Sequence, residues 1–313
     1  MDFPPLDFGS VRTYPLRERE SKVHNDQLAR TWKKGDSLTR FLDSLPRILA
    51  GNDFRAVVDA TVAAVRGQRP VLVMMGAHPI KCGLTPIFVH LMERGVISAV
   101  AFNGAGAIHD FELALVGQTS EDVQHGLNDG SFGMADETGR LMNRAMAEGV
   151  QQGIGAGRAL GQAIVTGKFP NKQLSILHQG VISNIPVTVH ISIGTDIIHQ
   201  HPTTDGAVLG EASYLDFQKF AAVVAQLEGG IALNIGSAVI MPEVFLKALT
   251  IARNLGHTVD HFTTANFDMI RHYRPTENVV RRPTAKGGHG HYLIGHHELM
   301  IPLWAAAVLE QLP

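Results

Sequence analysis

The stretch Ser98-Ala99-Val100-Ala101-Phe102-Asn103-Gly104-Ala105-Gly106-Ala107-Ile108-His109-Asp110 decides the fold. Its apolar start is too short for a helix and predicts a buried strand. Small residues at the carboxyl end of this strand leave the backbone open to a ligand. A helix that begins there directs its free N–H groups at an anion, which is how an open α/β sheet holds a nucleotide beyond its strand ends. Taken alone, the same glycines also fit a plain turn.

Length and composition narrow the class of protein. The 313 residues predict one large domain or two small ones. Apolar residues make up 45% and charged residues 18%, as in a soluble α/β enzyme. The formal net charge of −2 and the shortness of basic runs such as Arg281-Arg282 argue against a nucleic-acid partner. Cys82 is the single cysteine, which excludes an internal disulfide and any multi-cysteine metal site.

Two further features concern location. The sequence contains no apolar run of the roughly 18 residues that a membrane span needs. The N-terminal Met1–Pro5 lacks the basic-then-apolar layout of a signal peptide. We therefore expect a cytoplasmic protein with no membrane partner.

Apolar runs alternate with helical patterns along most of the chain. Residues 1–36 are polar and charged and predict an N-terminal arm, either packed on a neighbour or partly disordered. Residues 37–313 predict a single α/β domain, with a long loop over 119–139. Strands alternating with helices indicate a doubly wound, mainly parallel sheet. The strands are expected at residues 71–75, 98–102, 187–191, 230–235, 258–263 and 292–294.

Several of these strands run into small or hydroxylated residues. In a parallel sheet such ends share one edge, so together they predict a ligand crevice more strongly than any one glycine does. His78 and His109 are expected to line this crevice. The candidate cofactor-binding residues are Gly76, Ala77, His78, Asn103, Gly104, Ala105, Gly106, Asp110, Gly194, Thr195, Gly236, Ser237, Thr264 and Ala265.

The glycine-rich stretch 153–161 looks like a dinucleotide fingerprint. That motif requires a preceding strand, whereas the segment before it, residues 142–150, has a helical pattern. We interpret these glycines as a helix break or as tight packing.

With these strand ends in place, residues 70–310 resemble the deoxyhypusine synthase family. The resemblance is ordered along the chain, although no single motif is specific. The family's landmarks match, in order, Ala105-Gly106-Ala107 with Asp110, Arg158–Gly161, Ile185-Pro186-Val187, Ser192–Asp196, Thr264-Ala265 and Arg274–Glu277.

The resemblance implies a Rossmann-like sheet with NAD bound at the strand ends. It also implies a homotetramer with sites shared at subunit interfaces. In that family NAD takes a hydride from spermidine, and an active-site lysine carries the butylamine group as an imine. The cofactor would supply the redox chemistry and the lysine the nucleophile.

The chain departs from the family at the residues of polyamine chemistry. The imine-forming lysine falls on Pro283, with Lys286 three positions away as a substitute. The catalytic histidine falls near Met241, the polyamine-packing tryptophan on Arg281, and the aspartate that holds the nicotinamide nucleotide on His296. Deoxyhypusine formation itself is therefore not expected.

Two carboxylates and a histidine segment are the candidates for chemistry. Asp196 and Glu277 stand at family-like positions and together could grip a cationic amine; a helix cap and a surface ion pair are the alternative roles. His289 or His291, in a glycine-rich segment with Lys286, is the candidate general base if this segment covers the site. A solvent-exposed histidine tail is the alternative.

Two other motifs have weaker interpretations. The spacing Asp196-x-x-His199-x-His201 suits a metal triad, but nothing in the sequence places the three on one face, and we expect no metal. Cys82 has no identified base beside it and is expected to be a buried spectator.

Three functions remain open at this point. The first is an NAD-dependent enzyme that acts on a small amine or amino acid by hydride transfer. The second is a non-catalytic NAD-binding sensor or structural relative, which the missing lysine and histidine favour. The third is a histidine-rich, metal-dependent hydrolase on the same scaffold.

Overall fold

The computed structural model describes all 313 residues. By its internal contacts the chain divides into two units, Met1–Asn52 and Asp53–Pro313. The expected division after residue 36 stays a prediction.

The first unit contains short elements only. Ser37 caps helix α1, since its Oγ accepts a hydrogen bond from Arg40 N at 3.3 Å. Backbone hydrogen bonds of 2.8 Å from Arg30 N to Ser44 O and from Arg47 N to Gln27 O hold the segment before this helix. The elements of this unit are η1 (Phe8–Ser10), η2 (Leu16–Glu18), η3 (Asn25–Gln27) and α1 (Leu38–Ser44).

The second unit is built on one sheet of six parallel strands in the order β3-β2-β1-β4-β5-β6. This is the strand order of the doubly wound dinucleotide-binding fold, in which the order reverses between the first and fourth strands. The predicted α/β class and parallel sheet are confirmed. The strands are β1 (Val71–Met75), β2 (Ala99–Asn103), β3 (Val187–His190), β4 (Ile231–Ile235), β5 (Thr263–Asp268) and β6 (His289–Ile294).

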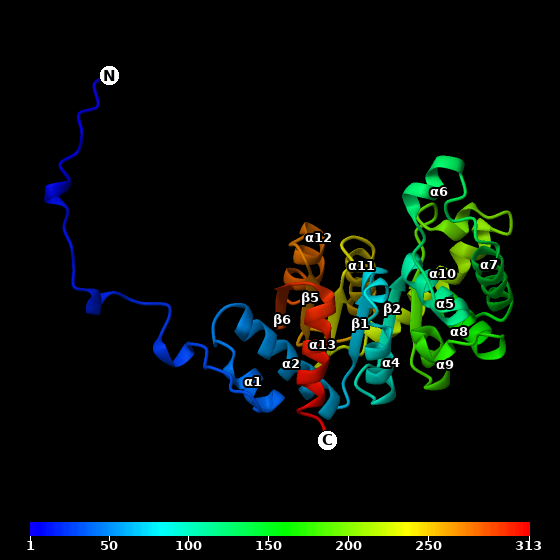
Figure 1. Cartoon of the computed structure of the whole chain (residues 1–313), viewed down its shortest axis with the longest axis horizontal. Coiled ribbons are helices and arrows are strands. Elements are labelled where there is room, and N and C mark those ends of the chain that lie inside the picture. The colour runs from blue at the N-terminus through cyan, green and yellow to red at the C-terminus, as the bar shows by residue number, and fades with distance from the viewer. The chain divides into compact units, whose positions relative to one another are not determined.

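Helices cover both faces of the sheet. Helices α2, α4 and α13 cover one face (Figure 1). Helix α13 contacts α4, and Trp304 Nε1 of α13 donates a hydrogen bond to Thr61 Oγ1 of α2. Helices α10 and α11 pack together on the other face. The helices are α2 (Ala50–Arg66), α3 (His78–Lys81), α4 (Thr85–Glu93), α5 (Gly104–Val116), α6 (Val123–Asp129), α7 (Asp136–Gln151), α8 (Ala156–Thr166), α9 (Ile176–Ile182), α10 (Gly206–Val224), α11 (Ile240–Asn254), α12 (Tyr273–Pro275) and α13 (His297–Leu309), with the short η4 (Lys172–Leu174) and η5 (Ile197–Gln200) and the π-helix η6 (Thr276–Arg281).

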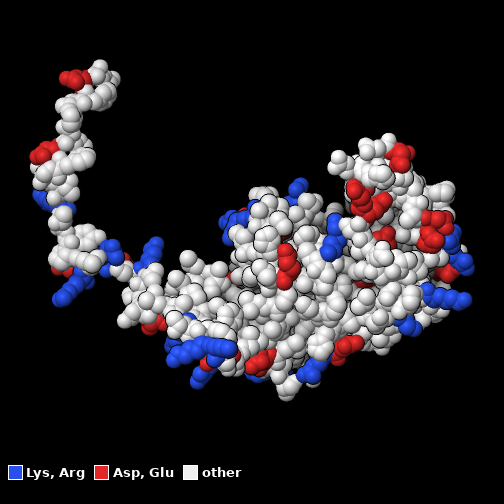
Figure 2. Space-filling view, in the orientation of Figure 1, with Lys and Arg blue, Asp and Glu red and all other residues white.

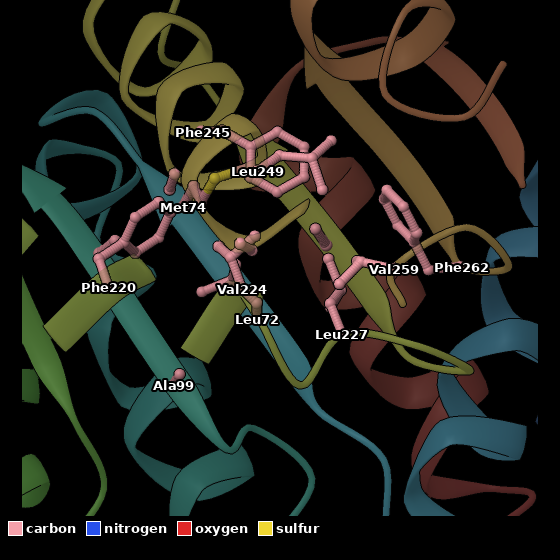
Figure 3. Close-up of a cluster of buried hydrophobic side chains, with 14 of the residues drawn as sticks. Leu72, Met74, Ala99, Phe220, Val224, Leu227, Phe245, Leu249, Val259 and Phe262 are labelled. Atoms are coloured by element: carbon pink, nitrogen blue, oxygen red, sulfur yellow. The ribbon is translucent and has the colours of Figure 1, made fainter. Parts of the chain in front are cut away.

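The core explains why the central strands are apolar without alternation. Leu72 and Met74 of β1 point toward Phe220 of α10 and Phe245 of α11 (Figure 3). The intervening residues of β1 are equally buried, because helices cover the opposite face as well.

Three elements of the structure differ from those expected from the sequence. Residues 119–139 are not a structureless loop, since α6 and the start of α7 lie within them. Strand β5 begins at Thr263, where we expected a strand to end. The N–H groups of Asp260 and His261, inside the expected strand, donate hydrogen bonds to Glu228 Oε2 at 2.6 and 2.9 Å. Strand β6 begins at His289 and not at Tyr292.

The surface charge is mixed in sign. In the view of Figure 2, Lys and Arg side chains are scattered among Asp and Glu side chains over the visible surface. No helix in the structure is both long enough and apolar enough to span a membrane.

Candidate functional site

Two glycines lie where the strand order reverses, between β1 and β4. Gly76 and Gly236 directly follow β1 and β4, so both lie at the carboxyl edge of the sheet. Gly76 N donates a hydrogen bond to Ile235 O at 3.2 Å, and a Cβ on Gly76 would lie 2.6 Å from Gly236 O. Gly236 has φ +65°, which favours glycine. Only residues without a side chain fit this crossing point, where doubly wound sheets bind their ligands.

The end of β2 continues directly into a helix. Asn103 caps α5, since its Oδ1 accepts a hydrogen bond from Gly106 N at 2.9 Å. A Cβ on Gly104 would lie 1.9 Å from Asp196 Oδ2, so the carboxylate of Asp196 rests against this helix start. Ala105 remains partly exposed at the same edge. The stretch Ser98–Asp110 therefore forms the predicted strand and the start of the helix that follows it.

Asp196 and His199 form a buried polar pair beyond β3. His199 Nδ1 accepts hydrogen bonds from Gly194 N at 3.1 Å and Asp196 N at 3.3 Å, so the proton of the neutral ring sits on Nε2. His199 Nε2 lies 3.8 Å from Asp196 Oδ2, and neither atom has a hydrogen-bond partner. Burial raises the pKa of Asp196 to about 6 and lowers the pKa of His199. The pair thus holds an unused donor and an unused acceptor beside the start of α5.

His297 is a second polar residue of this edge, although its sequence context does not single it out as a site residue. Its Nε2 donates a hydrogen bond to Phe267 O at 3.1 Å, which leaves Nδ1 as an acceptor without a partner. The ring lies against Gly236, and its centroid is 5.4 Å from that of His78. The signal in the sequence was its position at the first turn of the helix that follows β6.

Cys82 is half-buried and not fully buried as expected. Its Sγ lies 3.3 Å from Nε2 of His78, so a base does stand beside it. Burial nevertheless raises the pKa of the thiol, which disfavours the reactive thiolate.

A cavity of about 420 Å³ opens beyond the carboxyl end of β3, between α10 and α11. Apolar side chains, among them Phe217 and Val244, line most of it. His190, Ser192, Ser213, Tyr214 and Glu243 contribute its polar groups. Such a lining fits an apolar ligand group with a few polar anchors.

Asp110 lies in α5 but is turned away from the carboxyl edge. Its carboxylate is fully buried and accepts hydrogen bonds from Ser175 Oγ at 2.6 Å, Ile176 N at 2.8 Å and Leu177 N at 3.1 Å. These contacts cap the start of α9. In this chain the aspartate at the family-like position holds a helix in place, and burial raises its pKa to about 6.

The three candidate catalytic residues lie at the wrong edge of the sheet for the expected role. His289 and His291 pair with Thr263 and Ala265 at the amino end of β5, and Lys286 forms an ion pair with Asp260 at 3.6 Å. The glycines around them do not make a mobile cover: a Cβ on Gly290 would lie 2.1 Å from Val280 O, so glycine is required for close packing. Within one chain these side chains do not meet the strand ends.

Asp196 and Glu277 are not brought together either. Asp196 follows β3 and Glu277 follows β5, and three strands lie between these two in the sheet. At roughly 4.8 Å per strand spacing, the two carboxylates of one chain cannot grip the same small amine. Glu277 instead pairs with Arg281 at 2.7 Å and with Arg282 at 3.7 Å.

The last two predicted cofactor residues lie inside a strand. Thr264 and Ala265 sit near the amino end of β5 and are fully buried, because the strand continues to Asp268. The remaining ones, Gly194, Thr195 and Ser237, do follow the carboxyl ends of β3 and β4.

The metal triad suggested by spacing is not assembled. His201 Nε2 donates a hydrogen bond to Gly133 O at 2.8 Å and is thus committed elsewhere. No group of three His, Cys, Asp or Glu side chains in the structure is arranged to hold a metal ion.

A buried histidine at the end of β3 makes stability depend on pH. Burial lowers the pKa of His190 from 6.5 to about 3, so the folded chain keeps this ring neutral where the unfolded chain protonates it. Because the unfolded state then binds the extra proton, stability falls as the pH drops below 6.5. We expect His190→Gln, which can keep the contact with Thr188, to remove about 2 kcal/mol of the stability loss between pH 7 and pH 5.

Urea unfolding of both proteins at several pH values measures this difference. The exposed His125→Gln serves as control and should leave the pH dependence unchanged. Equal pH dependence in wild type and His190→Gln would contradict the expectation.

Comparison with known proteins supports the fold. AgrE, solved in a ternary complex with ornithine and NAD+, matches with a TM-score of 0.51 and 14% identity over 86% of this chain and 35% of that chain. ArgZ, an arginine dihydrolase from cyanobacteria, matches with a TM-score of 0.52 and 14% identity over 85% of this chain and 34% of that chain. The chain thus spans about a third of the length of these neighbours.

A protein of Entamoeba histolytica provisionally assigned as a deoxyhypusine synthase matches over 90% of this chain and 96% of that chain, with a TM-score of 0.48 and 8% identity. No family model and no curated protein matches the sequence. Membership of the deoxyhypusine synthase family therefore stays a prediction.

Proposed function

We propose that this protein is an NAD-dependent enzyme that acts on a small amine or amino acid by hydride transfer, and that it does not make deoxyhypusine. The observation that carries the proposal is the reversal of strand order between β1 and β4, with the closely packed glycines Gly76 and Gly236 at that point. The AgrE complex with ornithine and NAD+ supports this pairing of cofactor and substrate class on the same fold.

The residues of the carboxyl edge fit a dinucleotide. At Gly76, Gly104 and Gly236 the protein's own atoms take the place of a side chain, so the strand ends pack closely at the edge where doubly wound sheets bind a dinucleotide. Three buried polar atoms there lack partners: Asp196 Oδ2, His199 Nε2 and His297 Nδ1. Unpaired buried groups are costly, so a ligand that satisfies them gains affinity. NAD, when bound, would supply the hydride acceptor.

Asp196 is the amine-binding residue that we assign within one subunit. Its unpartnered oxygen can accept a hydrogen bond from a cationic amine, while His199 Nε2 donates to a substrate oxygen or to the carboxylate. We assign the substrate's apolar part to the cavity beyond β3, whose lining reaches Ile193, three residues before Asp196 in the chain. We also propose the homotetramer with shared interface sites, which would bring a second carboxylate such as Glu277 from another subunit, and a cytoplasmic location.

A sensor that binds NAD without turnover is the second candidate function. Pro283 at the family's lysine position favours it. The metal-dependent hydrolase receives no support from the arrangement of side chains.

The reaction is tested by following NADH absorbance at about 340 nm with a panel of amines and amino acids that includes ornithine. We expect Asp196→Asn to raise KM for the amine at least about tenfold, because the neutral amide loses the charge-assisted contact. We also expect KM of the wild type to fall as the pH rises through about 6, where Asp196 ionises, and this pH dependence to vanish in the variant.

Asp59 is exposed, so Asp59→Asn is the matched control. It should change neither KM for the amine nor the pH dependence of KM. Cofactor binding without NADH formation from any member of the panel would favour the sensor. A KM unchanged in Asp196→Asn would remove Asp196 from the amine site.

A further inference from the structure

A cavity of about 620 Å³ lies at the opposite edge of the sheet from the proposed cofactor site. It opens at the amino end of β3, between α8, α9 and α10. Its size is that of small-molecule sites. Its apolar wall is formed by Ile154, Leu177, Pro186, Val187, Leu215 and Ala222.

The glycine-rich stretch after α7 builds one side of this cavity. Helix α7 ends at Gln151 and α8 begins at Ala156, so no strand precedes the glycines and they are not a dinucleotide fingerprint. A Cβ on Gly157 would lie 1.9 Å from Val187 O, which confirms tight packing of α8 on the strand.

The one carboxylate in the wall is already committed to the backbone. Asp216 Oδ2 accepts hydrogen bonds from Gly157 N at 2.8 Å and Val189 N at 2.7 Å. Burial raises its pKa to about 7. Asp216 therefore does not present a free negative charge to a cationic ligand.

Two cations at the same cavity have no acidic partner. Arg158 forms only a 3.5 Å hydrogen bond to Asn184 Oδ1, and Lys219 forms no ion pair. By contrast, Arg140 and Arg144 on the preceding helix are each paired with a carboxylate, at 2.8 and 2.7 Å. An apolar wall beside two unpaired cations matches an anion that has an apolar body.

We propose that this cavity binds a small amphipathic anion, an apolar body that bears a carboxylate or phosphate group, held by Arg158 and Lys219. The site is separate from the cofactor site, because Val187 is the first residue of β3 and the proposed cofactor lies beyond the strand ends.

Isothermal calorimetry with octyl phosphate and octanoate tests the proposal on the full chain, with octylamine and inorganic phosphate as comparison ligands. We expect both anions to bind, octylamine not to bind, and inorganic phosphate to bind at least about tenfold more weakly than octyl phosphate, since it lacks the apolar body. The double variant Arg158→Gln/Lys219→Gln should weaken octyl phosphate at least about tenfold.

Two further variants locate the binding. Ala222→Phe, which fills the cavity, should abolish octyl phosphate binding. Lys168→Gln/Lys172→Gln removes two exposed cations that do not line the cavity and should leave octyl phosphate binding unchanged. Excess NAD+ should not displace octyl phosphate, which keeps this test independent of the cofactor proposal. Octylamine binding as tight as octyl phosphate, no binding of either anion, or unchanged affinity in both cavity variants would overturn the proposal.

Discussion

Replacing Gly157 with alanine is expected to lower the free energy of unfolding by about 3 kcal/mol. The added Cβ would lie 1.9 Å from the carbonyl oxygen of Val187, and a backbone atom in a central layer cannot move aside as a flexible side chain can. The same residue donates its N–H to Asp216, so displacing α8 also weakens a buried hydrogen bond.

Gly210→Ala is the matched control for this prediction. A Cβ on Gly210 meets nothing within 4 Å, and the residue lies inside α10, where alanine is favoured over glycine by up to about 1 kcal/mol. Urea unfolding followed by circular dichroism should show a lower free energy of unfolding for Gly157→Ala and no decrease for Gly210→Ala. Equal stability of the two variants would mean that α8 does not dock on β3 as described.

Asp110→Ala is expected to lower the free energy of unfolding by about 3 kcal/mol and to leave the NAD+ affinity of the folded protein unchanged. Three buried donors, Ser175 Oγ and the N–H groups of Ile176 and Leu177, would lose their acceptor. Each unpaired buried group costs about 1–3 kcal/mol, and release of the buried charge offsets part of the sum.

The two possible roles of Asp110 give opposite results. A residue that caps α9 affects stability in urea unfolding but not the dissociation constant of NAD+ in calorimetry. Unchanged stability combined with a large loss of NAD+ affinity would place Asp110 in the cofactor site after all. Asp110→Asn, which keeps one acceptor oxygen, should lie between wild type and the alanine variant in stability.

Most of the sheet could be predicted because its strands are short apolar runs buried on both faces. Val71–Met75 and Ile231–Ile235 are examples whose sequence and structure agree almost residue for residue. Strand β5 could not be placed correctly from its pattern. The segment 258–263 alternates as well as Thr263–Asp268 does, but the N–H groups of Asp260 and His261 donate to Glu228, whereas Thr263–Asp268 pairs with both neighbouring strands.

The candidate site could be predicted only where it depends on strand ends. Gly76, Gly104 and Gly236 follow their strands directly, so a local pattern was sufficient. The unpartnered atoms of His199 and His297 depend on tertiary contacts with the backbone, which no spacing in the sequence reveals. The glycine-rich segment 286–291 has the composition of a mobile cover, but Gly288 and Gly290 allow close packing and do not provide mobility.

Calorimetry of NAD+ with the wild type, Ala77→Phe and Ala285→Phe shows whether the dinucleotide binds where the strand order reverses. Ala77 is partly exposed next to Gly76 at the carboxyl end of β1, and Ala285 is exposed at the opposite edge of the sheet. We predict that the wild type and Ala285→Phe bind NAD+ equally well, and that the ring added at residue 77 weakens binding at least about tenfold by filling the cofactor's place. Failure of the wild type to bind NAD+, or equal weakening by both substitutions, would contradict a dinucleotide site at the reversal of strand order.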